Sequence, residues 1–76
     1  MEEKMISVFN EINDEINSFE GDNLFEAGLL DSFQVLDLVA EIENAFDIEI
    51  DAKYVIEENF KSKNAMIALV KSLLGD

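Results

Sequence analysis

Residues 32–46, SFQVLDLVAEIENAF, carry the strongest helical pattern in the chain. Apolar residues recur there at every third or fourth position, which places them on one face of an α-helix. Asp31 suits the N-cap, and Gln34 stands at the third helical position, as in a capping box. The segment therefore predicts a helix from Ser32 to Phe46. Its inward stripe is expected to consist of Val35, Leu38, Ile42 and Phe46.

Two other segments show the same period. Residues 5–16 predict a first helix, and residues 63–74 predict a last helix that begins at a Ser62 cap and ends before Gly75. A short helix is expected around Lys53–Glu57, with Asp51 as its cap. The expected inward residues are Met5, Phe9, Ile12 and Ile16 in the first helix, and Met66, Leu69, Val70 and Leu73 in the last.

The chain has 76 residues, so residues 1–76 are expected to form a single domain. Residues 17–31 break the helical period and predict a long loop whose apolar side chains anchor it to the core. These side chains are Leu24, Phe25, Leu29 and Leu30. The predicted fold class is all-α, a small four-helix bundle of three main helices plus a short third helix, with a long loop between helices 1 and 2.

The composition excludes several kinds of chemistry. The chain has no Cys and no His, which excludes disulfides, thiolate metal sites and Ser-His-Asp catalysis. The net charge is −13, and residues 5–52 contain acids but no base, so nucleic acid is an unfavourable partner. The longest apolar run, residues 65–70, is too short to span a bilayer. We therefore expect a cytoplasmic monomer with no membrane insertion, whose acidic surface attracts basic proteins.

One acidic segment has the spacing of a calcium-binding loop. Residues 47–58 place acids at positions 1, 3, 5 and 12 of an EF-hand-like pattern. Ala52 stands where the sharp turn needs Gly, and Val55 stands at a ligand position, so no metal site is expected. The neighbouring Glu57-Glu58 pair is interpreted as solvated rather than catalytic, and no glycine-rich phosphate loop is present.

The sequence GLLDSFQ, residues 28–34, marks the helix start at Asp31. Because Asp31 alone can cap this helix, Ser32 is free at the first helical position. Its hydroxyl is then expected to be exposed beside unpaired backbone N–H groups, a setting that favours phosphate. On local pattern alone, these residues predict only an ordinary capped helix start.

Residues 24–50, LFEAGLLDSFQVLDLVAEIENAFDIEI, resemble the family of acyl, peptidyl and D-alanyl carrier proteins. The GLLDS segment is closer to D-alanyl carriers and to stand-alone carriers of secondary-metabolite pathways than to classical fatty-acid carriers. The matching features are Gly28 in the loop, Asp31-Ser32-Phe33 at the helix start, Glu43-Asn44-Ala45-Phe46 at its end, and ENFKSKNAMIALV at residues 58–70.

The resemblance implies a non-catalytic carrier. Ser32 would carry a 4′-phosphopantetheine arm, transferred from coenzyme A by a phosphopantetheinyl transferase, with Asp31 and Phe33 beside it. The thiol of the arm would hold acyl or aminoacyl groups as thioesters for partner enzymes. The pathway stays open between fatty-acid or secondary-metabolite synthesis and the D-alanylation of teichoic acid.

The resemblance also implies a partner surface on the helix from Ser32 to Phe46, facing basic loading and transfer enzymes. The apolar members of this surface have core packing as their alternative role. A rival function is an unmodified acidic adaptor that binds a basic protein and does not need Ser32. The expected partner-binding residues are Phe33, Leu36, Asp37, Val39, Ala40, Glu41, Glu43 and Asp47.

Overall fold

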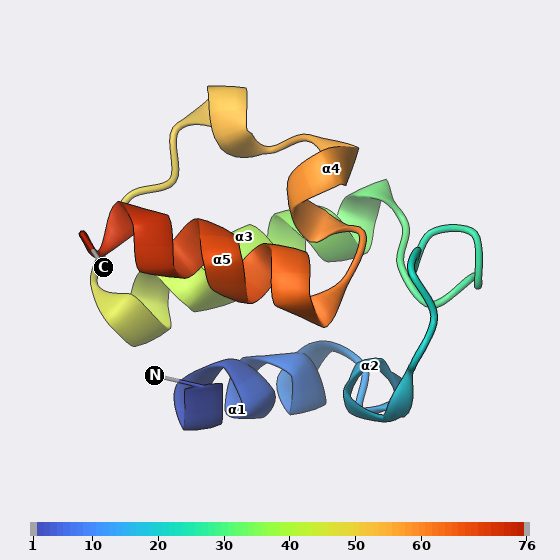
Figure 1. Ribbon diagram of the computed structural model, residues 1–76. Helices are drawn as coiled ribbons and strands as arrows, with labels where there is room; N and C mark the ends of the chain where they lie inside the picture. The colour runs from blue at the N-terminus through green and yellow to red at the C-terminus, as the bar shows by residue number, and fades with distance from the viewer. Residues whose placement is uncertain (1, 76) are drawn as a thin grey trace.

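The computed structural model describes residues 2–75, which form helices joined by loops and contain no strand (Figure 1). This confirms the predicted all-α bundle. Helix α1 packs against α3, and the short α4 leads directly into α5. No helix in this range is long and apolar enough to cross a membrane. The elements are α1 (Glu2–Ile12), α2 (Glu15–Ser18), α3 (Ser32–Phe46), the 3₁₀ turn η1 (Ala52–Tyr54), α4 (Glu57–Phe60) and α5 (Lys63–Leu73).

The core lies between α1, α3 and α5 and is built from the predicted apolar stripes. Burying each large side chain of this kind contributes about 1.5–3 kcal/mol, so the core is the main source of stability. Three expected members, Ile12, Phe46 and Leu73, are only partly buried at the core edge. The largest fully buried side chains are Met5, Phe9, Ile16, Leu24, Leu38, Ile42, Phe60, Met66 and Val70.

The expected first helix is wrong beyond Ile12, because the chain breaks there and a separate turn, α2, follows. The side chain of Asn13 accepts a hydrogen bond from the backbone N–H of Glu15 at 3.0 Å. Asparagine commonly competes with helical hydrogen bonding in this way. Ile16 still reaches the core, since α2 turns its apolar side inward.

The expected short helix around Lys53–Glu57 is wrong in its extent. The structure has the η1 turn at Ala52–Tyr54 and a separate α4 that begins only at Glu57. The Asp51 cap is confirmed, because its carboxylate accepts from the backbone N–H of Lys53 at 3.0 Å. The second turn is needed to bring Phe60 into the core, where it is fully buried.

Local hydrogen bonds and one bond to the α4–α5 connection hold the loop before α3 in place. Oδ1 of Asn23 accepts hydrogen bonds from the backbone N–H groups of Phe25 and Glu26. Gly28 has a φ of +79°, which glycine adopts without steric cost. The backbone N–H of Leu24 donates to the carbonyl of Lys61 at 2.6 Å, which ties the loop to the α4–α5 connection. All four predicted anchors pack on the core, Leu24 and Leu30 fully and the other two partly.

Candidate functional site

The start of α3 presents one free hydroxyl. Asp31 has extended backbone angles, and its carboxylate accepts from the backbone N–H of Gln34 at 2.9 Å, as the predicted cap requires. Within residues 2–75, the Gln34 side chain makes no return bond, so the second half of the capping box is not formed. Ser32 is the first helical residue and is exposed, and its hydroxyl has no hydrogen-bond partner among these residues.

Ser32 borders an open groove of about 430 Å³, which we call the Ser32 groove. Its walls come from the loop before α3, from the first turn of α3, and from the segment between η1 and α4. Most of its lining side chains are apolar, and within the described part of the chain the only charged one is Glu57. The lining residues are Phe25, Ser32, Val35, Leu36, Val55, Ile56 and Glu57.

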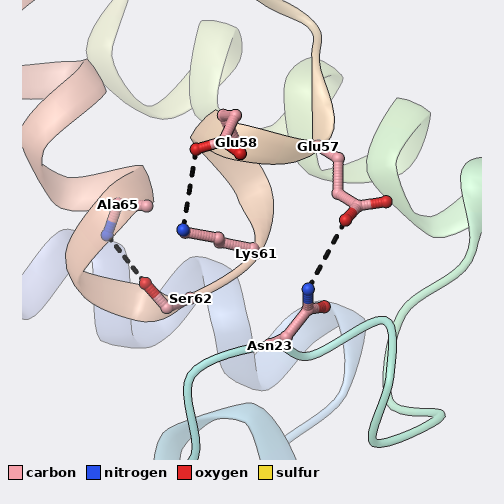
Figure 2. A network of polar contacts seen from close by, with 6 residues as sticks. All are labelled: Asn23, Glu57, Glu58, Lys61, Ser62 and Ala65. Atoms are coloured by element: carbon pink, nitrogen blue, oxygen red, sulfur yellow. Dashed lines mark hydrogen bonds and ion pairs between the residues drawn. The ribbon is translucent and has the colours of Figure 1, made fainter.

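The two adjacent glutamates of α4 point to different neighbours (Figure 2). The Asn23 side chain donates to Oε2 of Glu57 at 3.4 Å, from the loop that precedes α3. Glu58 instead forms an ion pair with Lys61 at 3.6 Å, one turn further along. Glu57 is among the residues that line the Ser32 groove, whereas Glu58 does not line it and is paired with Lys61.

Large apolar side chains surround Ser32 at the surface. Phe33 is 77% exposed, Leu36 is 62% exposed and Ile56, across the groove, is 50% exposed. Isolated exposed apolar residues are common, but a group of them beside one hydroxyl indicates an interaction surface. Ala40 is also exposed, whereas Val39 is partly buried against the core. Core packing, the alternative role of these residues, therefore applies in part to Val39. It does not apply to Phe33, Leu36 or Ala40.

The acids of α3 are divided between different surroundings. Asp37 and Glu41 are exposed, and Glu41 lies on the side facing α1. Residue 37 is one turn earlier, so it lies on the same flank of the helix. Glu43 is partly buried, and its carboxylate accepts from the backbone N–H of Ile50. Asp47 ends α3 in the left-handed conformation with a φ of +54°.

The sequence did not single out half of the groove. Phe25 was expected only as a loop anchor, and Glu57 only as a solvated acid. The Val55-Ile56 pair was a usable signal, because it is an apolar pair in the expected short helix, to which no inward stripe was assigned. Such a pair has no core position assigned to it by the pattern, so it is free to form a surface wall.

The arrangement offers an acceptor hydroxyl but no machinery to activate it. No His exists in the chain, and the carboxylate of the preceding residue, Asp31, is engaged in capping. A serine without a neighbouring base is a weak nucleophile. Ser32 is therefore suited to receive a group from another enzyme, which would supply the base.

A family model described as the phosphopantetheine attachment site matches residues 4–74. The D-alanyl carrier protein of Streptococcus uberis is 31% identical over 74 residues, covering 96% of this chain and 94% of the relative. The D-alanyl carrier protein of Leuconostoc citreum is 30% identical over 76 residues, covering 99% of this chain and 97% of the relative. A third D-alanyl carrier protein, from Leuconostoc mesenteroides, is 29% identical over 76 residues.

Proposed function

The chain belongs to the phosphopantetheine attachment-site family of carrier proteins, and from this premise we propose that Ser32 is the residue that bears the arm. As a member of this family, the protein holds acyl groups as thioesters on a covalently attached 4′-phosphopantetheine. Proteins of this kind are generally non-catalytic carriers. The observation that supports Ser32 most directly is its exposed, unpartnered hydroxyl at the start of α3.

The residues around Ser32 fit a phosphopantetheine group. The first N–H groups of α3 have no intrahelical partner, and one of them, on Gln34, is already used by Asp31. Those of Ser32 and Phe33 are left for a phosphate, which helix N-termini favour. The apolar walls of the Ser32 groove suit the methyl and methylene groups of the arm. When bound, the arm supplies the thiol that this Cys-free chain lacks.

Each residue at the helix start has a proposed role. Ser32 Oγ would attack the pantetheine-side phosphorus of coenzyme A; the pyrophosphate bond would break, adenosine 3′,5′-bisphosphate would leave, and the hydroxyl proton would pass to a base of the phosphopantetheinyl transferase. Asp31 holds the first turn of α3 in place through its bond to Gln34. Phe33 extends into solvent beside the ester and is available to contact the transferase.

We propose an aminoacyl cargo, and D-alanine in particular. This rests on the names of the three D-alanyl carrier proteins, each of which covers nearly the whole of this chain. An acyl cargo in another pathway is the alternative. The carrier that bears the arm but no cargo is incubated with adenylating enzymes for D-alanine or for fatty acids. The mass of the thioester formed distinguishes the two cargoes.

The proposed partner surface has an apolar strip with acids along one side. Phe33, Leu36 and Ala40 are exposed along α3, and Asp37 and Glu41 lie on its α1-facing flank. Such a pattern suits loading and transfer enzymes that place an apolar patch within a rim of Lys and Arg. The protein is proposed to act as a monomer in the cytoplasm, where coenzyme A provides the arm.

The attachment is tested by incubation with coenzyme A and a broad-specificity transferase, followed by intact mass measurement. We expect one phosphopantetheine on the parent protein and none on Ser32→Ala. Ser72→Ala, an exposed serine at the far end of α5, is the control and should load normally. Loading of Ser32→Ala would refute the assignment. The unmodified adaptor would be supported instead if the parent protein never loads and if Ser32→Ala complements cells that lack the protein.

A further inference from the structure

We propose that Glu57 accepts a hydrogen bond from an N–H group of the loaded arm and thereby holds the arm in the Ser32 groove. This inference rests on the proposed attachment at Ser32. It makes Glu57 a positioning residue that favours N–H donors and opposes anionic cargo. No feature of the sequence pattern pointed to this role, since Glu57 was interpreted there as a solvated acid.

The first argument is location. Ser32 and Glu57 line the same groove, one at the start of α3 and the other at the start of α4. The other lining side chains are apolar, including Leu36 and Ile56. A chain that leaves the Ser32 hydroxyl and follows these walls meets Glu57, the only charged side chain of the groove among residues 2–75.

The second argument is the state of the carboxylate. Glu57 has no ion-pair partner among residues 2–75, whereas Glu58 is paired with Lys61. Its one hydrogen bond, from Asn23 to Oε2, is long at 3.4 Å. A carboxylate accepts several hydrogen bonds at once, so Oε1 and part of Oε2 are available. Asn23 meanwhile restrains the side chain on its loop side (Figure 2).

The third argument is chemical matching. An ionised carboxylate accepts hydrogen bonds and donates none, so it selects donors. The loaded arm offers N–H donors from two sources, the amides of the pantetheine and the ammonium of an aminoacyl cargo. Bonds of either kind to a carboxylate are charge-assisted and stronger than neutral ones. No lysine lines the groove, so a cargo with its own carboxylate would meet only repulsion there.

The test compares Glu57→Ala with Glu58→Ala, two adjacent exposed sites that lose the same charge and the same atoms. Each protein is loaded at Ser32 from ¹⁵N-labelled coenzyme A, or from its propionyl or alanyl thioester, and loading is verified by intact mass. NMR then measures hydrogen exchange of the arm amides and the titration of the alanyl amine in each protein, and contacts between arm protons and the γ-protons of Glu57 in the proteins that keep it.

If the pantetheine amide is the donor, its exchange should be about two- to five-fold faster in Glu57→Ala than in the parent, whatever the cargo. If the ammonium is the donor, only the alanyl form should differ, and the pKa of its amine should be higher in the parent than in Glu57→Ala. Glu58→Ala should resemble the parent in both cases.

Equal exchange, equal amine titration and no contact with Glu57 in a fully loaded protein would overturn the inference and leave the attachment at Ser32 intact. An equal effect of Glu58→Ala would also overturn it, because the cause would then be general charge. Failure of the parent protein to load would show in the mass spectrum and would overturn the proposed attachment together with the inference.

Discussion

The carboxylate of Glu43 accepts a hydrogen bond of 2.8 Å from the backbone N–H of Ile50, across the turn that ends α3. Asp47 stands in the left-handed conformation at this turn, and the chain then continues toward η1 and α4. Because Ile50 is buried, this hydrogen bond fixes the start of the segment that follows α3. Further along, the same segment contains Val55 and Ile56, which line the Ser32 groove. One glutamate thus connects the far end of α3 to a groove wall.

Glu43→Ala should destabilise the protein by about 1–2 kcal/mol, because the Ile50 N–H loses a charged acceptor in a partly buried position. Chemical denaturation of the apo protein measures this. Glu41→Ala is the control, since Glu41 is exposed on the same helix and should change stability by no more than about 0.5 kcal/mol. Equal effects of the two substitutions would show that charge, and not this hydrogen bond, is responsible.

Asp31→Ala should cost about 1 kcal/mol of stability through loss of the α3 cap. Asp31→Asn keeps a side-chain oxygen for the Gln34 N–H and should retain most of this stability. The midpoints of urea unfolding compare the three proteins. A loss in Asp31→Asn as large as that in Asp31→Ala would contradict a capping role, because it would trace the effect to the charge.

Phe33→Ser should leave stability within about 0.5 kcal/mol of the parent, since 77% of the side chain is already exposed. If Phe33 is an anchor for partner enzymes, kcat/KM of the phosphopantetheinyl transferase should fall about five- to thirty-fold, the effect of losing 1–2 kcal/mol of contact. Ile6→Ser, at an exposed apolar position on α1, provides the control. The role would be refuted by unchanged transfer, or by an equal loss in Ile6→Ser.

Salt should raise the melting temperature. The net charge is −13, and its excess lies in residues 5–52, where no base offsets the acids. Self-repulsion of these exposed carboxylates opposes the compact state. At 0.1 M salt, ions largely screen the repulsion between charges more than about 10 Å apart. Thermal unfolding at rising NaCl or MgCl₂ measures the effect. A melting temperature that responds to neither salt would show that the crowded charge carries no significant cost.

The sequence by itself determined the bounds of α3 and three helix or turn caps, but not the break after Ile12 or the separate α4. The bounds of α3 and the caps Asp31, Asp51 and Ser62 follow from residue types at fixed spacing. These features depend on hydrogen bonds within a few residues, so local order is enough to predict them. The exposed hydroxyl of Ser32 follows from the same local geometry, because Asp31 already serves as the cap.

Only the tertiary structure decided which apolar residues face water and which distant residues meet Ser32. The broad apolar arc of α3 fits several orientations, and the burial of Leu38 and Ile42 in the shared core is what leaves Phe33 and Leu36 exposed. Glu57 joins the Ser32 groove from 25 positions along the chain. Helical periodicity records a residue's place on its own helix, whereas its neighbours across the fold depend on how all the helices pack together.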